Sequence, residues 1–200
     1  MDDVMNRQAL EDAGISPAKA RIVAKAVDLF YEKGFERTTV RDIAAATGIL
    51  SGSLFHHFKN KQEILYTAMA MTTRGMGERA EAAVAGISDP VEQLKALIIC
   101  ELSSIHREDG HAAYVLVDEW RSLDEASREK VLALRDGSYE KCWMDALEGC
   151  AGKGLLKSPP KIARQLIRGA LAWTRNWYRA DGDLTLAGLA DEVTKSFLKN

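Results

Sequence analysis

The stretch that most constrains the fold of this chain is "TTVRDIAAATGILSGSLFHHFKNK", residues 38–61. Its apolar spacing predicts two very short helices on either side of Gly48. Thr39 can cap the first of them because an acidic residue follows three positions later, and the second begins at Ser51 or Gly52. Helices of this length are marginal in isolation. We therefore expect a packed motif in which neighbouring segments hold both helices in place.

A longer helix precedes this pair. Ser16 and Pro17 form a start signal, a capping serine followed by a proline in the first turn, and Gly34 is the expected C-cap. Leu54 and Phe58 are four positions apart, so they share one face of the last short helix. This face should pack against three apolar residues of the preceding segments, Phe30, Ile43 and Ile49. Three helices with a tight turn before the third describe a helix-turn-helix.

The other face of the last short helix is then free to enter a DNA major groove, N-terminus first. Ser51, Gly52 and Ser53 are small, so the backbone there can approach bases and phosphates closely. The alternative for the two histidines is an exposed pair without a role. The predicted phosphate donors along this edge are His56, His57, Lys59 and Lys61.

Charge is distributed unevenly along the chain. Residues 17–62 hold eight Lys and Arg against four Asp and Glu, whereas the whole chain has a formal charge of −2, so the remaining residues carry −6. A basic first quarter on an acidic body favours an anionic partner at one end. A solvated helix face would give the same pattern.

The rest of the sequence predicts an all-helical protein of about nine helices. Hydrophobic residues make up 46% of its 200 residues, enough for a sizeable core. No apolar run reaches the length of a membrane span, and the acidic N-terminus lacks the apolar stretch of a signal peptide. Three cysteines without CxxC spacing argue against zinc or a disulfide framework. We therefore expect a cytoplasmic protein without a metal or cofactor. The apolar periodicity also predicts one long helix over 124–150 and another from Pro160 through Tyr178.

The segments "TTVRDIAAATGI" and "GSLFHHFKNK" resemble the signature of TetR-family transcriptional repressors. The match covers roughly residues 18–65, with a capped helix, a glycine turn and an aromatic-His-Phe-x-x-Lys ending in register. The resemblance implies an all-α fold with an N-terminal three-helix DNA-binding bundle and a C-terminal helical domain for ligand binding and dimerisation. We expect a flexible arm over 1–16, the DNA-binding domain over 17–62 and the ligand-binding domain over 63–200.

The resemblance also implies roles for single residues. Thr39 and Arg41 should contact phosphates at the start of the second helix, His57 matches the usual histidine, and Lys61 matches the usual phosphate-binding lysine. Phe55 departs from the family's tyrosine and lacks its hydroxyl, so it should make apolar contacts or pack. His56 also stands where the family often has a tyrosine. The residues at which the family usually makes base contacts are Ser51, Gly52 and Ser53.

The region beyond Gln62 holds all four tryptophans, and a TetR-like body must host a mostly apolar pocket. Each candidate lining residue could instead pack in the core. Trp173 and Trp177 could also form part of a dimer interface. The candidate ligand-binding residues are Met69, Leu97, Ile98, Tyr114, Trp120, Trp143, Trp173, Asn176 and Trp177.

The ending "RGALAWTRNWYRADGDLTLAGLADEVTKSFL" resembles one TetR subset, whose penultimate helix ends in Trp-Tyr-Arg before a short turn. Many members of that subset control lipid, steroid or aromatic-acid degradation and respond to acyl-CoA thioesters. Arg168, Arg175 and Arg179 could then meet CoA phosphates. The alternative is that these arginines face solvent or pair with acidic residues across the dimer.

Together these features predict a ligand-responsive repressor that binds a palindromic operator as a homodimer, with its last two helices forming the dimer contact. A small apolar or acyl-CoA-type effector should release the DNA by favouring a dimer whose recognition helices no longer match successive grooves. The fourth helix, from Asn60–Lys61, is the expected lever. The alternatives are an all-helical protein-interaction module or an enzyme, although His106 and His111 have no catalytic or metal-ligand arrangement around them.

Overall fold

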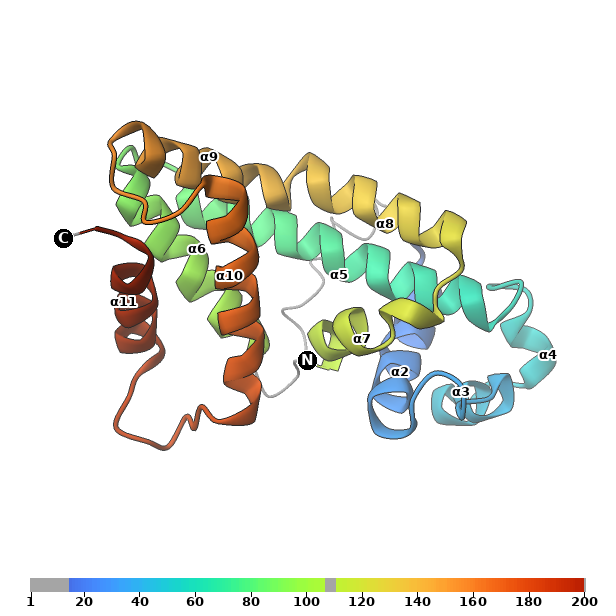
Figure 1. Cartoon of the computed structure of the whole chain (residues 1–200). Helices are drawn as coiled ribbons and strands as arrows, with labels where there is room; N and C mark the ends of the chain where they lie inside the picture. The colour runs from blue at the N-terminus through green and yellow to red at the C-terminus, as the bar shows by residue number, and fades with distance from the viewer. Residues whose placement is uncertain (1–14, 107–110, 200) are drawn as a thin grey trace. The chain divides into compact units, whose positions relative to one another are not determined.

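The structure is a computed structural model that describes residues 15–106 and 111–199. Every regular element in these ranges is a helix, and β-type pairing there is confined to an isolated bridge between Leu156 and Leu198 (Figure 1). The predicted all-α class is confirmed. Residues 1–14 of the predicted flexible arm lie outside the described part. None of the helices in the described ranges has the length and apolar character needed to cross a membrane.

The described chain forms two compact units, one of residues 15–75 and 111–134 and one of residues 76–106 and 135–199. The predicted functional boundary after Gln62 stays a prediction. The helices, labelled as in Figure 1, are α2 (Pro17–Lys33), α3 (Val40–Thr47), α4 (Ser51–Leu54), α5 (Lys61–Val84), α6 (Pro90–Ile105), α7 (His111–Asp118), α8 (Glu125–Gly137), α9 (Tyr139–Gly152), α10 (Pro160–Trp173) and α11 (Leu186–Phe197), with 3-10 turns η1 (Trp120–Ser122) and η2 (Thr174–Asn176).

The first helices of the first unit begin and end where the sequence predicts, because local groups occupy their free backbone atoms. Ser16 Oγ accepts a hydrogen bond from a backbone N–H of the first turn of α2, and Thr39 forms a complete capping box with Asp42 before α3. Gly34 and Gly48 end these helices with φ angles of 81° and 70°. Other residues rarely adopt such angles, so both turns depend on glycine.

An apolar core fixes the three N-terminal helices of this unit against one another. Leu54 and Phe58 are buried and pack against Phe30 and Ile43, with Ile49 partly buried at the edge of the cluster. The packing predicted for the helix-turn-helix is confirmed. Residues distant in the sequence complete the same core: Val115, Leu123 and Val131.

The second unit contains α6, α9, α10 and α11, and its core encloses a charge. Arg164 on α10 is 2% exposed, although Trp143 and other apolar side chains surround it. Its Nε donates to Glu140 Oε2 at 3.0 Å, and its guanidinium lies 4.1 Å from the Trp143 ring centroid. Arg168, one turn further along α10, also pairs with Glu140. One buried guanidinium is therefore both stacked and ion-paired.

A second carboxyl borders the same guanidinium. Arg164 Nη1 lies 3.6 Å from Glu101 Oε2, an ion pair too long to be a hydrogen bond. The Tyr139 hydroxyl donates to the same carboxyl oxygen at 2.6 Å. Burial raises the pKa of Glu101 and outweighs the lowering effects of Arg164 and Tyr139. The second core therefore contains a buried polar cluster in which Arg164, Glu101, Glu140 and Tyr139 are one another's partners.

The predicted single helix over 124–150 is wrong. α8 and α9 are separate helices, and Ser138 between them has φ −133° and ψ −66°. Ser138 Oγ donates to Glu81 Oε1 at 2.6 Å, and a Cβ atom at Gly77 would lie only 2.6 Å from the same Oγ. The break lies where the start of α9 packs tightly on α5, a contact that periodicity cannot reveal.

The predicted helix through Tyr178 is also shorter than expected. α10 ends at Trp173, and the next three residues form the η2 turn. The buried hydroxyl of Thr174 donates to the Leu171 carbonyl at 2.6 Å. Trp173 and Trp177 thus do not share one face of a continuous α-helix, and they are 66% and 50% exposed.

Candidate nucleic-acid interface

The recognition segment is shorter than a usual helix. α4 spans four residues and a turn continues over 55–57. Leu54 holds its inner side in the core, whereas Gly52, Phe55 and His56 are exposed. Three further predicted DNA-contact residues on this segment are half-buried: Ser51, Ser53 and His57.

Thr39 orients the start of α3. Its backbone N–H and its hydroxyl both donate to Asp42 Oδ2, each at 2.8 Å. These two bonds, the backbone one first, lower the pKa of Asp42, and Lys33 adds a smaller effect. Arg41 in the same turn is exposed to solvent. Arg41 can therefore reach a phosphate directly. The predicted phosphate contact of Thr39 requires its hydroxyl, which already donates to Asp42 in the capping box.

Lys61 occupies a different environment from the one its family position implies. Its ammonium donates to the carbonyls of Phe35 at 2.7 Å, Thr38 at 2.9 Å and Glu36 at 3.3 Å. It also lies 4.1 Å from the Phe35 ring centroid. A lysine ammonium has three donors, and all three are directed at the loop after α2. The phosphate contact of Lys61 stays a prediction, and the geometry gives it a positioning role.

The side chain of a second lysine, Lys59, is exposed just before α5. Asn60 Oδ1 accepts from Glu63 N at 2.9 Å, so the Asn60 side chain caps α5. Glu63 Oε2 in turn accepts from Lys59 N at 2.7 Å. The backbone of Lys59 is thereby fixed while its side chain stays exposed. Lys59 is well placed to contact a phosphate.

A relay of polar groups ties α7 and η1 to the helix-turn-helix. Glu119 Oε1 accepts from Phe35 N at 2.8 Å, and Glu119 Oε2 accepts from Ser122 Oγ at 2.6 Å. Gln62 Nε2 at the start of α5 donates to the Ser122 carbonyl at 2.7 Å. The loop after α2 is thus held from one side by Lys61 and from another by Glu119.

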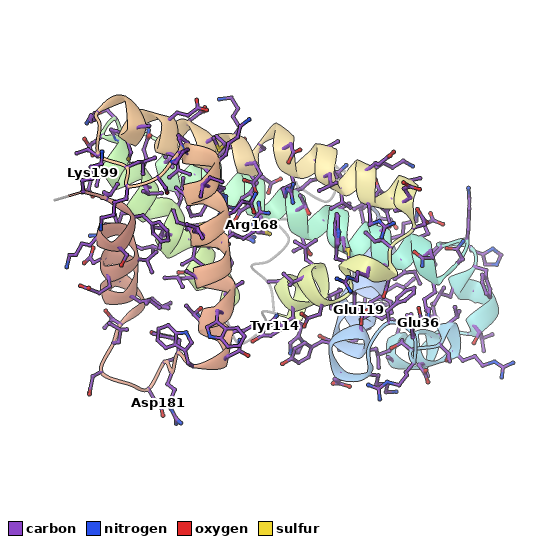
Figure 2. All side chains as sticks on the ribbon, in the orientation of Figure 1. Glu36, Tyr114, Glu119, Arg168, Asp181 and Lys199 are labelled. Carbon is purple, nitrogen blue, oxygen red and sulfur yellow. The ribbon has the colours of Figure 1, made fainter. Side chains whose placement is uncertain are left out.

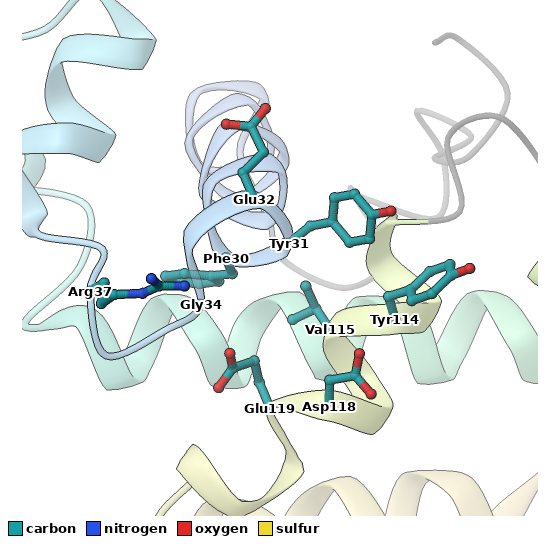
Figure 3. Close-up of a pocket in the computed structure, with 9 residues that line it drawn as sticks. All are labelled: Phe30, Tyr31, Glu32, Gly34, Arg37, Tyr114, Val115, Asp118 and Glu119. Atoms are coloured by element: carbon teal, nitrogen blue, oxygen red, sulfur yellow. The ribbon is translucent and has the colours of Figure 1, made fainter. Parts of the chain in front are cut away.

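An open groove of about 260 Å³ lies between α2 and α7 beside this relay (Figure 3). The ring of Tyr31 stacks on His111 with centroids 4.1 Å apart and meets Tyr114 edge-on. His111 Nδ1 lies 3.1 Å from Asp28 Oδ1. These contacts join α7 directly to α2.

Sequence reasoning missed two features of this unit. Glu119 gave no signal because its partners are distant in sequence, at Phe35 and Ser122. Leu50 is the other: it is 79% exposed immediately before α4. An apolar residue at a helix N-cap was the available signal, because polar residues are preferred there.

The candidate ligand-binding residues fall into both units, and their role stays a prediction. Met69 is buried in the core of the first unit and Trp120 is partly buried against it. Leu97, Ile98 and Trp143 are buried in the second core. The remaining candidates are Tyr114 on α7 and the exposed Trp173, Asn176 and Trp177.

The three arginines proposed to meet CoA differ in their surroundings. Arg168, which is labelled in Figure 2, pairs with Glu140 beside the buried cluster. Arg179 is 78% exposed and forms a bond with Asp181 at 3.2 Å. Arg175 in η2 is half-buried. Arg179 is therefore the most accessible of the three, and Arg168 is already part of the second core.

Comparisons with known proteins agree with this geometry. The family model for bacterial regulatory proteins of the tetR family matches residues 22–67. A second, for the tetracyclin repressor-like C-terminal domain, matches residues 88–200, more than half of the chain. The chain therefore belongs to the TetR family of transcriptional regulators, which are ligand-responsive, DNA-binding homodimers.

Individual relatives support the same assignment over nearly the whole length. The transcriptional repressor KstR2 of Rhodococcus jostii is 31% identical over 94% of this chain and 91% of its own. A structure of superantigen PfiT is 45% identical, with a TM-score of 0.81 over 92% of this chain and 98% of that chain. AibR, solved with isovaleryl coenzyme A and operator DNA, shares the fold at 24% identity and a TM-score of 0.80, covering 90% of this chain and 97% of that chain. Relatives such as KstR2 are regulators, which are not enzymes.

Proposed function

We propose that the chain is a repressor that is released from its operator by a small apolar or acyl-CoA-type effector. The observation that carries the DNA-binding part is the recognition segment, a buried Leu54 face backed by exposed small, basic and aromatic residues. DNA-binding helix-turn-helix proteins present the start of such a helix to the major groove. The relatives named as repressors support the direction of control.

The effector class rests on two supports. AibR shows that this fold can accommodate an acyl-CoA and operator DNA. In the present chain, Arg175 and Arg179 lie just beyond α10, and breaking the exposed pair of Arg179 with Asp181 costs little. A CoA phosphate could therefore replace Asp181 as the partner of Arg179. Arg168 is a weaker candidate because Glu140 already neutralises it.

The outer face of α10 supports the dimer contact. Ile162, Leu166 and Trp173 are each more than half exposed, and they recur at helical spacing. Gly169 and Ala170 lie between them and are also exposed, so a partner helix can approach closely. An exposed apolar stripe of this kind indicates a protein contact. We assign it to the second copy of this chain, related by twofold symmetry.

Signal transfer to the DNA would use groups that bridge α7, α5 and the helix-turn-helix. Glu119 and Gln62 join η1 and the end of α7 to the loop after α2 and to the start of α5. An effector that binds one arrangement of these helices better shifts the population toward it. A change in α7 would then alter the position of the recognition segment.

A gel shift tests this function. The probe is DNA from the upstream region of the chain's own gene, with and without a panel of acyl-CoAs and the matching free acids. Release by thioesters alone supports the effector class, and Arg179→Ala should then weaken release, with Arg128→Ala on α8 as an arginine control. Binding that no thioester releases would remove the effector class and leave the repressor intact.

A further inference from the structure

The strongest unexplained feature of the interface is Leu50. It is 79% exposed, the highest value among the large apolar side chains that are exposed in the described residues. It precedes α4 directly, with φ −70° and ψ 143°, and makes no side-chain capping bond. Its own backbone carbonyl accepts from Ser53 N at 2.9 Å and from Leu54 N at 3.3 Å. The backbone of Leu50 therefore starts the recognition helix while its side chain projects into solvent.

Nothing within the folded chain explains a leucine at this position. A serine, threonine or aspartate would satisfy a free N–H of the next turn, and its replacement by an apolar residue costs about 1 kcal/mol of stability. The same unit uses such a residue at the start of α3, where Thr39 caps the helix. An exposed leucine also gains nothing from burial in the free protein. The expected gain lies in a bound state that covers the side chain.

The neighbouring residues determine what can cover it. Ser51, Gly52 and Ser53 follow immediately and are small, so none of these three side chains keeps Leu50 away from a groove. A leucine neither donates nor accepts hydrogen bonds, so it cannot read the polar edges of bases. Among the groups that distinguish bases in the major groove, the C5-methyl of thymine is the apolar one.

We infer that Leu50 is a specificity residue that contacts the C5-methyl group of one thymine in each half of the operator. This inference rests on the proposed function, because it requires that the recognition segment enters the major groove. Burying one methyl against an aliphatic side chain gives an affinity gain of about fourfold for each half-site. Phe55, which is 54% exposed at the other end of α4, is the competing apolar contact.

The test begins with duplexes selected by the wild-type protein from a random pool. Each symmetric pair of thymines in the best duplex is then replaced by deoxyuridine, which lacks only the methyl group. Fluorescence anisotropy gives the dissociation constants for wild type, Leu50→Ala and Phe55→Ala. We expect one thymine pair whose replacement weakens wild-type binding about fifteenfold, no such difference for Leu50→Ala, and an unchanged difference for Phe55→Ala.

Several outcomes would overturn the inference. Wild-type binding that is insensitive to deoxyuridine at every position, or a full difference retained by Leu50→Ala, would show that Leu50 reads no methyl group. A difference lost only in Phe55→Ala would assign the contact to Phe55. Should Leu50→Ala bind too weakly for comparison, Leu50→Val must show an intermediate difference. If the wild type enriches no duplex at all, the proposed function fails and this inference with it.

A thermal melt separates these results from misfolding. Leu50→Ser should melt at the same temperature as the wild type or higher, because serine can cap α4. It should nevertheless lose the preference for thymine over uracil. A lower melting temperature for Leu50→Ser would show that the leucine stabilises the free protein, which contradicts the inference.

Discussion

The two units of this protein use their polar side chains in opposite places. In the first unit the core is apolar, and the polar groups act on the backbone at helix ends: Thr39 caps α3, Lys61 binds three carbonyls, and Glu119 binds an N–H. In the second unit the polar groups lie inside, where Arg164 is buried with Glu101 and Glu140.

This difference follows from the size of the helices. Helices of four and eight residues leave at least half of their backbone groups without a partner inside the helix, so their position depends on external partners at each end. The longer α6, α9 and α10 satisfy their own backbone and position each other by packing. Their buried charges contribute less to net stability than their number suggests, but removal of one partner is severe.

The largest expected effect is the loss of Arg164. Arg164→Met should lower the free energy of unfolding by about 3–5 kcal/mol, because the buried carboxyls of Glu101 and Glu140 lose their partner. Urea denaturation followed by circular dichroism measures this change. Arg179→Met is the control, since that side chain is exposed and should lose less than about 1 kcal/mol. Equal losses in the two variants would show that the buried cluster does not stabilise the second unit.

The matching change in the first unit is Lys61→Met. It keeps the apolar stem and removes the ammonium from three carbonyls, so we expect a loss of about 2 kcal/mol in the same assay. Lys59→Met should leave stability unchanged and instead reduce the salt dependence of DNA binding by about one unit of slope. If Lys61→Met is as stable as the wild type and changes only the salt slope, then Lys61 acts on phosphate rather than on the loop.

The helix caps give a smaller contrast. Thr39→Val removes the two hydrogen bonds that the Thr39 hydroxyl makes with Asp42, one donated to Oδ2 and one accepted from the backbone N–H, and should lower stability by about 1 kcal/mol. Thr185→Val in the second unit removes a single bond to Gly188 N, and the loss should be smaller. Denaturation of both variants measures the difference. A larger loss at Thr185 would contradict the view that backbone capping matters most in the first unit.

The smallest effect is a difference in pH dependence. The lowered pKa of Asp42 gives stability that is present above its unfolded pKa, near 3.8, and is lost as the pH falls through the folded value. The raised pKa of Glu101 has the opposite sign, with stability present below its unfolded pKa, near 4.5, and lost as the pH rises through the folded value.

Denaturation midpoints of the wild type, Asp42→Asn and Glu101→Gln across pH 3–8 would test both signs. The gap between the wild type and Asp42→Asn should close as the pH falls. The wild type should lose stability relative to Glu101→Gln as the pH rises. Parallel curves for all three proteins would show that neither carboxyl is perturbed in the folded state.

Local patterns in the sequence predict where the first helices of the first unit begin and end. Caps and glycine turns act within four residues, so Ser16, Thr39, Gly48 and Asn60 could all be identified from the sequence. The apolar periodicity did not predict the break at Ser138, where the chain packs closely on Gly77, 61 residues earlier. Polar contacts of the DNA-binding region that join residues distant in sequence, such as Glu119 with Phe35, could not be predicted from local patterns either.

Long-range contacts also decided which lysines and arginines are free. Lys61 and Lys59 look alike in the sequence, yet one ammonium is directed at the loop after α2, 23–26 residues away, and the other side chain is exposed. Arg164 was not singled out, since an arginine on a helix usually faces solvent. Only the positions of Glu101 and Glu140 show that it is buried and paired.

One measurement tests the central claim most directly, and it uses Gly52. A Cβ atom there would have no neighbour within 4 Å, and the residue is exposed. Gly52→Leu should therefore leave the melting temperature unchanged or higher, since leucine is the better helix former. Its affinity for the selected operator duplex should fall at least about tenfold, because the new side chain would occupy the space of the DNA. A variant that folds and binds the duplex as tightly as the wild type would contradict the account, because the recognition segment could not then lie against the groove.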